Sequence, residues 1–177
     1  MTPPLLLRVH ETLAAAEIPH ALIGAAALAV HGVSRSTFDQ DLLVTRTRVL
    51  DPHIWSSLIA TTRIDIRRGD YDDPLAGVVR VSADGDRDVD VVVGKDDWQH
   101  EIIEAAVTHD LRAGAIPVAS PAGLVLLKLY AGGPQDLWDI EQLRAIGGAT
   151  LDAAVASRVV RLPASAREAW RRLALGR

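Results

Sequence analysis

Several residue types and patterns are missing from this sequence, and each absence excludes a class of protein. The 177 residues contain no cysteine, which excludes a disulfide framework, thiolate catalysis and a zinc site with sulfur ligands. No apolar run approaches the ~20 residues that a membrane-spanning helix requires. Residues 1–7 lack the basic start and the cleavage site of a signal peptide. We therefore expect a soluble, cytoplasmic protein with no membrane partner.

An excess of positive charge is also missing. The formal net charge is −4 at pH 7, which excludes a uniformly basic nucleic-acid-binding protein and leaves only a local basic patch for such a role. Lysine is scarce, since 2 lysines stand beside 17 arginines. Because the chain uses arginine almost throughout, the positions where it keeps lysine, Lys95 and Lys128, are candidates for a specific role.

The residues that are present have a globular composition and two successive patterns. The apolar fraction is 49%, as in ordinary folded domains. Alternating or β-branched runs predict strands, and apolar residues at helical spacing predict helices. The predicted strands are 21–24, 39–44, 63–67, 78–81 and 88–93. The predicted helices are 5–16, 25–30, 54–60, one from residue 97, 122–131 and two or three beyond 134, with an irregular or extended stretch at 111–119. We therefore expect an α/β (α+β) core at residues 1–117 and a helical portion at residues 118–177 that packs on it.

Two aspartates, Asp39 and Asp41, form the first candidate site. Residues two apart on a strand project from one face, and two carboxylates there repel each other unless a cation lies between them. Such oxygen ligands suit Mg²⁺, and two ions ~3.5–4 Å apart serve phosphoryl and nucleotidyl transfer. Aspartates at this spacing occur five times in the chain, so the pair indicates a site only through the sequence around it.

The sequence before this pair favours a phosphate-binding role. A strand that ends at Gly24 and opens a helix at Ala25 offers backbone N–H groups to a phosphate. The polar loop that follows contains Ser34 and Arg35, and a guanidinium fits a nucleotide phosphate well. An ordinary polar turn is the alternative interpretation of this loop.

A third aspartate, Asp90, lies inside the apolar run 88–93. Asp88 and Asp90 share one face of this predicted strand, and valines fill the other. Asp90 is the stronger candidate because an unpaired carboxylate within an apolar run would be costly. Asp88 could equally be a solvated residue at the rim.

The segment 120–131 contains Lys128 among apolar residues. Ser120 and Pro121 have the composition of a helix start. A compact ammonium group in a partly buried site suits a triphosphate or a carboxylate cluster, whereas a lysine that extends to solvent at a helix edge is the alternative. Asp136 and Asp139 follow on one helix face, and Asp136 either holds Lys128 in place or takes part in the chemistry.

Taken in order, these segments resemble the nucleotidyltransferase superfamily with a polymerase-β-like core. The nearest match is the AbiEii-type branch of bacterial toxin nucleotidyltransferases, a group of minimal nucleotidyltransferases. The resemblance is carried by the glycine turn at 24–25, His-Gly at 31–32, R-x-T-x-D-x-D at 35–41, S-P-x-x-L-x-x-x-K-L-x-A at 120–131 and D-x-x-D at 136–139.

The resemblance implies a nucleotidyltransferase core with a mixed sheet flanked by helices. It implies Asp39, Asp41 and Asp90 as catalytic metal ligands for Mg²⁺, with two ions expected and Mn²⁺ as the substitute. It implies that Lys128 is both catalytic and nucleotide-binding. The remaining nucleotide-binding positions that it implies are Gly24, Ala25, Ser34, Arg35 and Asp136. The expected substrate is a nucleoside triphosphate, the expected acceptor is a tRNA 3′ end or a protein side chain, and a cognate antitoxin is the expected partner.

Two alternatives stay open at this point. One is a degenerate member that keeps the fold and binds a nucleotide or a protein without catalysis. Ala25, Gln40 and Gly133 favour it, since relatives often carry a serine, an aliphatic residue and a basic residue there. The other uses the same carboxylates for phosphate hydrolysis or for phosphoryl transfer from GTP.

Overall fold

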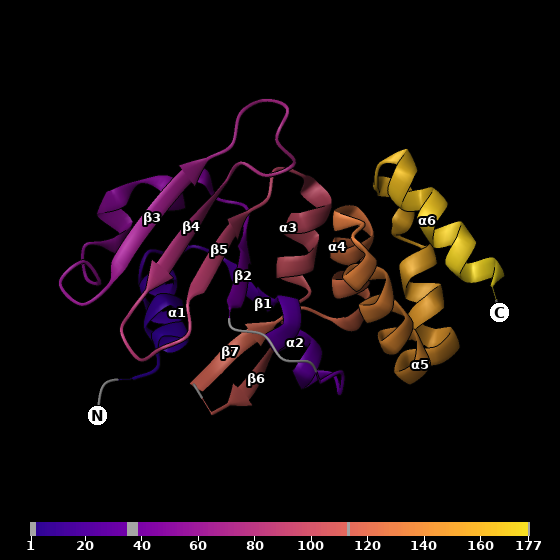
Figure 1. The fold of residues 1–177 in the computed structure, drawn as a ribbon, viewed down its shortest axis with the longest axis horizontal. Helices are drawn as coiled ribbons and strands as arrows, with labels where there is room; N and C mark the ends of the chain where they lie inside the picture. The colour runs from indigo at the N-terminus through magenta and orange to yellow at the C-terminus, as the bar shows by residue number, and fades with distance from the viewer. Residues whose placement is uncertain (1–2, 35–38, 113, 177) are drawn as a thin grey trace. The chain divides into compact units, whose positions relative to one another are not determined.

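The protein contains one mixed β-sheet with helices beside it (Figure 1). The computed structural model describes residues 3–34, 39–112 and 114–176, and in this part of the chain seven strands pair in the order β3-β4-β5-β2-β1-β7-β6. The strands are β1 His20–Ile23, β2 Gln40–Val44, β3 Arg63–Arg68, β4 Gly77–Ser82, β5 Val89–Val93, β6 Val107–Leu111 and β7 Gly114–Val118. The pairs β2–β5 and β1–β7 are parallel and the other pairs are antiparallel, which confirms the predicted mixed sheet.

Helices flank this sheet and make up the C-terminal portion. The α-helices are α1 Leu5–Ala15, α2 Gly24–Val30, α3 Asp97–Glu104, α4 Pro121–Ala131, α5 Pro134–Ala156 and α6 Ala164–Leu175. The short 3₁₀ helices are η1 Thr47–Leu50, η2 Pro52–Trp55 and η3 Val159–Arg161. The predicted helix start at Ser120 is confirmed, because its side chain accepts a hydrogen bond from the Gly123 N–H at 3.2 Å. None of the described helices is long and apolar enough to span a membrane.

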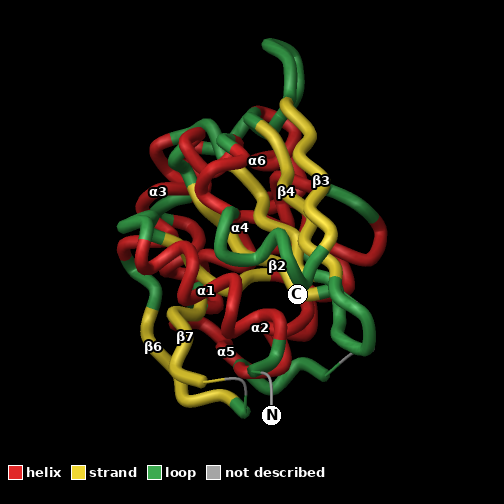
Figure 2. Tube along the Cα trace, turned by 90° about the vertical axis from the view of Figure 1, so that its left-hand side faces the viewer, coloured by secondary structure: helices red, strands yellow, loops and turns green. Residues whose placement is uncertain are grey.

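One prediction of local structure was wrong and another was incomplete. The segment 54–60 is not an α-helix, because the buried Trp55 side chain donates to the Val49 carbonyl and the Thr62 hydroxyl donates to the Leu58 carbonyl. Such side-chain bonds to the backbone compete with helix propagation. The stretch 111–119, predicted as irregular or extended, contains the strand β7. It pairs with the unpredicted strand β6 in a β-hairpin over residues 107–118, which can be followed in Figure 2. The edge strand β6 exposes most of its residues, so its sequence lacks the apolar alternation that predicts a strand.

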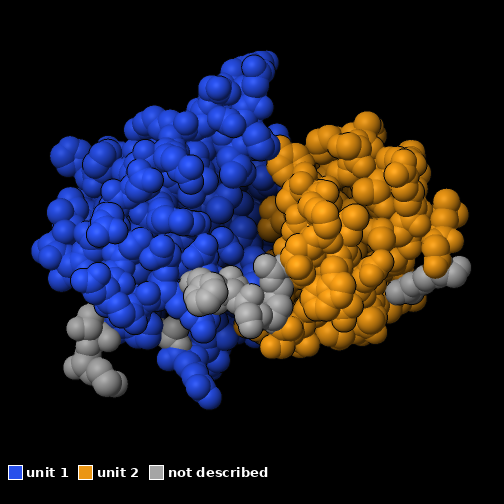
Figure 3. All heavy atoms as spheres, viewed as in Figure 1, with its two compact units in different colours: residues 1–26, 36–119 blue, residues 27–35, 120–177 orange. Residues whose placement is uncertain are grey.

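The described residues form two compact units (Figure 3). The first comprises residues 1–26 and 36–119 and contains the whole sheet. On one face of β4 and β5 the valines are fully buried, and α1 contacts β5 and β7. These valines are Val79, Val81, Val89, Val91 and Val93. Because side chains alternate along a strand, the residues between them, among them Arg80 and Asp90, project from the opposite face.

The second unit comprises residues 27–35 and 120–177 and is helical. Helices α4 and α5 pack along each other, and α5 is kinked at Gly148, where φ is 54° and ψ is −147°. Arg144 of α5 hydrogen-bonds Asp152 and lies 5.1 Å from the ring centroid of Trp170 of α6. The guanidinium therefore links the two segments of α5 on either side of the kink through its ion pair with Asp152. It joins α5 to α6 through the cation–π contact and a 2.7 Å hydrogen bond to the Leu173 carbonyl.

Candidate active site

The sheet brings the three predicted carboxylates to one face of the first unit. Strands β2 and β5 are neighbours, and Asp41 lies directly across from Asp90. Asp39 immediately precedes β2, two residues before Asp41, and therefore projects from the same side. A single parallel strand pairing thus brings together Asp41 and Asp90, which 48 residues separate in the sequence. The metal-binding role of the three carboxylates stays a prediction.

An arginine that the sequence did not indicate, Arg80, lies beside these carboxylates. It is directly across from Asp90 on β4. Its Nε donates to Asp90 Oδ1 at 2.8 Å and its Nη2 donates to Asp90 Oδ2 at 2.6 Å. The same Nη2 lies 3.5 Å from Asp39 Oδ2. A guanidinium bound to both oxygens of one carboxylate is a strong, directional pair, so Arg80 orients Asp90.

The ion pair is only partly shielded from solvent. The Asp90 side chain is 14% exposed, whereas the side chains of Arg80 and Asp39 are 41% and 45% exposed. The hydrogen bonds to Asp90, and then the negative charge of Asp90, raise the pKa of Arg80 above its ordinary value. Arg80 is consequently a permanent cation at the predicted metal site.

The site belongs to a row of charged residues that crosses four neighbouring strands. The pairing register places Asp65 of β3 across from Arg80, Arg80 across from Asp90, and Asp90 across from Asp41. Directly opposed residues have Cβ atoms roughly 4.5–5.5 Å apart and project from the same face. The row therefore alternates in sign from Asp65 through Arg80 to Asp90 and ends with two adjacent carboxylates.

Gly24 is packed against the second aspartate of the site. Its φ is +64°, a backbone angle that residues other than glycine rarely adopt. A Cβ built on it would overlap Asp41 Oδ2 and lie 3.2 Å from Asp41 Cβ. The predicted change from strand to helix occurs here, since β1 ends at Ile23 and α2 begins at Gly24. Glycine is thus required at this position by the backbone and by the approach of the carboxylate.

The three carboxylates are of the chemical type that binds a divalent cation, although Arg80 contacts two of them, Asp39 and Asp90. In the described part of the chain, no three histidine, aspartate or glutamate side chains are arranged closely enough to hold a metal ion. Asp39, Asp41 and Asp90 nevertheless supply hard oxygen ligands from one face, as Mg²⁺ prefers. Because Gly24 has no side chain, the Asp41 carboxylate has room beside it. These residues would be the ones to hold the metal.

The predicted lysine, Lys128, is held by two aspartates of the second unit. Its Nζ donates to Asp136 Oδ1 at 2.8 Å and lies 2.7 Å from Asp139 Oδ2. Asp139 is fully buried, and the Lys128 side chain is 13% exposed. Asp136 also accepts the Gly133 N–H through its other oxygen at 3.0 Å. Lys128 therefore does not extend to solvent, and Asp139 is a partner to which the sequence assigned no contact.

Three other predicted positions have different outcomes. Ser34 is exposed in the second unit, and Ala25 is buried at the start of α2. Arg35 lies outside the described residues. Lys95, the other rare lysine, has a structural role, since its Nζ donates to the carbonyls of Asp70, Tyr71 and Asp73 in the β3–β4 loop.

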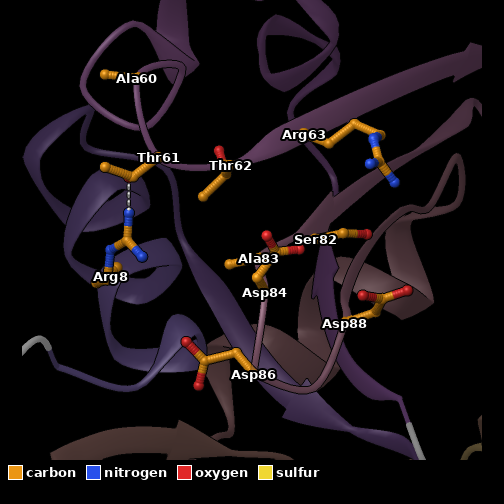
Figure 4. Close-up of a pocket in the computed structure, with 10 residues that line it drawn as sticks. All are labelled: Arg8, Ala60, Thr61, Thr62, Arg63, Ser82, Ala83, Asp84, Asp86 and Asp88. Atoms are coloured by element: carbon orange, nitrogen blue, oxygen red, sulfur yellow. Dashed lines mark hydrogen bonds between the residues drawn. The ribbon is translucent and has the colours of Figure 1, made fainter.

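A polar cavity of about 810 Å³ opens at the end of β4 and β5 in the first unit (Figure 4). Arg8, hydrogen-bonded to Thr61, lies on one side of it, and Asp88 lies on the other. Asp88 precedes Asp90 by two residues on the same face. Asp88 therefore lines the cavity, whereas the three predicted metal ligands are not among its lining residues.

Comparison with known proteins identifies the fold. Neither protein-family models nor curated protein sequences match this chain. Solved structures do match it along most of its length. An antigenic nucleotidyltransferase-like protein from Paracoccidioides brasiliensis has a TM-score of 0.52 at 16% identity and covers 96% of this chain and 95% of its own. The antibiotic-resistance factor ANT(2'')-Ia in solution has a TM-score of 0.55 at 17% identity, covering 89% of this chain and 90% of its own.

A crystal structure of ANT(2'')-Ia with adenylyl-2''-tobramycin also matches, with a TM-score of 0.55 at 14% identity over 89% of this chain and 96% of that one. The chain has a nucleotidyltransferase-like fold. This confirms the predicted fold class. Identities of 14–17% establish the fold alone, and the nucleotidyltransferase-like fold does not by itself assign a branch or an acceptor.

Proposed function

We propose that this chain is a metal-dependent nucleotidyltransferase that moves a nucleoside monophosphate from a nucleoside triphosphate to a macromolecular acceptor. The observation that carries the proposal is the convergence of Asp39, Asp41 and Asp90 on one sheet face within a nucleotidyltransferase-like fold. A solved neighbour, ANT(2'')-Ia, is bound to an adenylylated product, adenylyl-2''-tobramycin. That complex supports nucleotidyl transfer as the reaction class for this fold.

Each site residue has a role in the proposed reaction. Asp39, Asp41 and Asp90 would hold Mg²⁺, as two ions, or Mn²⁺ in its place. When bound, the metal supplies charge stabilisation at the phosphate oxygens. Asp90 also accepts the proton of the acceptor hydroxyl, whose oxygen attacks the α-phosphate while pyrophosphate leaves.

Binding of the triphosphate is assigned to the remaining predicted positions. Gly24 and Ala25 present backbone N–H groups to the phosphates. Ser34, Arg35, Lys128 and Asp136 contact the nucleotide, as the sequence resemblance implies. Lys128 needs Asp136 and Asp139 to fix its ammonium group before a nucleotide arrives.

The identity of the acceptor rests on the resemblance to the AbiEii-type branch. That resemblance supports a tRNA 3′ end or a protein side chain as the acceptor. It also supports a role as the toxin of a toxin–antitoxin pair, with a cognate antitoxin as partner. Growth arrest on expression of the wild type, but not of Asp41→Ala, is the expected result for a toxin.

The reaction is tested with α-labelled nucleoside triphosphates supplied one at a time, together with Mg²⁺, total tRNA and bulk protein. Wild type should move label to a macromolecule, and the labelled species would identify the acceptor. Asp41→Ala should not transfer label, whereas Asp110→Ala on the exposed edge strand β6 should behave as wild type. Release of free nucleotide without labelled macromolecule would instead indicate hydrolysis, and label transferred only from γ-labelled GTP would indicate phosphoryl transfer.

A second candidate is a catalytically degenerate protein with this fold that acts as a binding module. The Arg80 ion pair favours it, because both oxygens of Asp90 already hold a cation without a metal, and Asp39 Oδ2 lies 3.5 Å from the same guanidinium. A nucleotide that binds without metal, together with no transfer under any condition, would support this candidate. Nucleotide binding that requires Mg²⁺ would count against it.

A further inference from the structure

The guanidinium of Arg80 occupies the oxygens that the proposed metal needs. It binds both carboxylate oxygens of Asp90, at 2.8 and 2.6 Å, and approaches Asp39 Oδ2 at 3.5 Å. A carboxylate in a two-point bond with a guanidinium has used the lone pairs that point toward its partner. Arg80 and a metal ion therefore cannot hold Asp90 in the same way at once.

We infer that Arg80 is a positioning residue that competes with the metal ion, and that Asp65 receives its guanidinium when the metal binds. In the metal-free protein Arg80 offsets the repulsion among the carboxylates and keeps Asp90 oriented. When the metal binds, the guanidinium leaves Asp90 and turns across the sheet to Asp65. The inference rests on the proposed function, because the metal site is the same.

The strand register supplies both positions of the arginine. Arg80 on β4 has Asp90 across from it on β5 and Asp65 across from it on β3. An arginine side chain is long enough to reach either neighbour on its own face. Arg80 is 41% exposed and Asp65 lies on the exposed side of β3, so the movement requires no displacement of the core.

Asp65 is the carboxylate toward which the Arg80 guanidinium moves. A guanidinium that stayed beside a divalent cation would be repelled by it, since like charges a few ångströms apart interact unfavourably. Moving one strand outward takes the positive charge away from the metal and next to another carboxylate. Asp65 should therefore favour metal binding although it does not touch the metal.

Binding of Mn²⁺ alone to the full chain, measured by isothermal titration calorimetry, tests the inference without any catalytic step. Arg80→Gln removes the competing cation and should tighten Mn²⁺ binding about tenfold, the factor that corresponds to one charge-assisted hydrogen bond. Arg67→Gln is the matched control, because it removes the same charge from the same face of the sheet. Arg67 lies on the neighbouring strand β3, across from Val78 and not from a carboxylate. The substitution should change the affinity by less than about twofold.

The role of Asp65 is tested by a double-mutant cycle. Asp65→Asn alone should weaken Mn²⁺ binding about threefold, because the displaced guanidinium loses its acceptor. In the Arg80→Gln background the same change should have no effect. If Asp65→Asn weakened binding equally in both backgrounds, Asp65 would act through its charge alone and the transfer of Arg80 to it would be wrong.

The wild-type chain provides a test that no variant can confound by misfolding. The Nε–H of Arg80 should give a hydrogen-bonded arginine side-chain signal in a ¹H–¹⁵N spectrum, assigned by its loss in Arg80→Lys. Addition of Mg²⁺ should shift this signal toward that of an arginine in an exposed pair. A signal that stays unchanged at saturating Mg²⁺ would overturn the inference.

Failure of the inference and failure of the proposed function give different results. If Arg80→Gln binds Mn²⁺ no more tightly than wild type while wild type transfers a nucleotide, Arg80 does not compete and the function stands. If Arg80→Gln binds Mn²⁺ more tightly and no variant transfers a nucleotide, the competition stands and the function is wrong.

Discussion

At the scale of single residues, the close approach of Gly24 to Asp41 leads to the first prediction. Gly24→Ala introduces a Cβ that overlaps the Asp41 carboxylate. The carboxylate must move, so we expect Mn²⁺ affinity and nucleotide transfer to fall at least about tenfold. Backbone strain at a φ of +64° should in addition lower the free energy of unfolding by about 1–3 kcal/mol.

Gly85→Ala is the matched control for this strain. Gly85 also has a positive φ, +81°, but a Cβ built there meets no atom within 4 Å. Urea unfolding should show a similar loss of stability for both variants, while only Gly24→Ala loses metal binding. Equal metal binding by the two variants would contradict the positioning role of Gly24.

The second prediction at this scale concerns the ammonium group of Lys128. Lys128→Met removes the cation from Asp139, which is fully buried, and from Asp136. A buried carboxylate that loses its cation should lower the free energy of unfolding by about 3–5 kcal/mol. The double change Lys128→Met with Asp139→Leu should restore part of this loss, because both charges are then removed. A loss below about 1 kcal/mol in urea unfolding of Lys128→Met would show that the cluster does not stabilise the fold.

At the scale of secondary-structure elements, a histidine pair joins α1 to the start of β1. The buried His20 donates from Nδ1 to the Ile18 carbonyl at 2.7 Å, so its Nε2 accepts from His10 Nδ1 at 2.7 Å. Burial lowers the pKa of both histidines below the ordinary value. The folded state therefore binds fewer protons than the unfolded state as the pH approaches and passes below about 6.5.

This difference makes stability depend on pH in a defined direction. The contribution of the pair is fully present above the unfolded-state pKa of about 6.5 and is lost as the pH falls through the lower folded-state pKa values. Urea unfolding between pH 7.5 and 5 should show a decline in stability for wild type. His20→Gln should flatten that decline in this range. An unchanged slope in His20→Gln would mean that other groups cause the decline.

Local pattern was sufficient for the elements whose apolar residues face the core. The predicted ranges 5–16, 63–67 and 122–131 agree with α1, β3 and α4 within a residue or two. The edge strand β6 and the segment 54–60 were not predictable in this way. The conformation of β6 depends on pairing with β7 across a tight turn, and that of 54–60 on side-chain bonds to the backbone. Neither leaves a periodic apolar signal.

At the scale of the whole molecule, the order of the motifs was enough to predict the fold. It was enough to predict only part of the site. Asp39, Asp41 and Asp90 could be proposed because each lies on a strand with a recognisable face. Arg80 could not, since its importance depends on the register between β4 and β5. A charged residue between buried valines, as in Val79-Arg80-Val81, marks the opposite face of a strand but not what lies across from it.

The carboxylates on the sheet face are proposed to catalyse nucleotidyl transfer. The most direct measurement is transfer of α-label from each nucleoside triphosphate to total tRNA and protein by wild type and by Asp41→Ala, with Mg²⁺ and with EDTA. If they catalyse this reaction, a labelled macromolecule should appear only with wild type and Mg²⁺. Equal labelling by Asp41→Ala, or no labelling and no Mg²⁺-dependent nucleotide binding by wild type, would contradict this role and leave a nucleotidyltransferase-like fold used for binding.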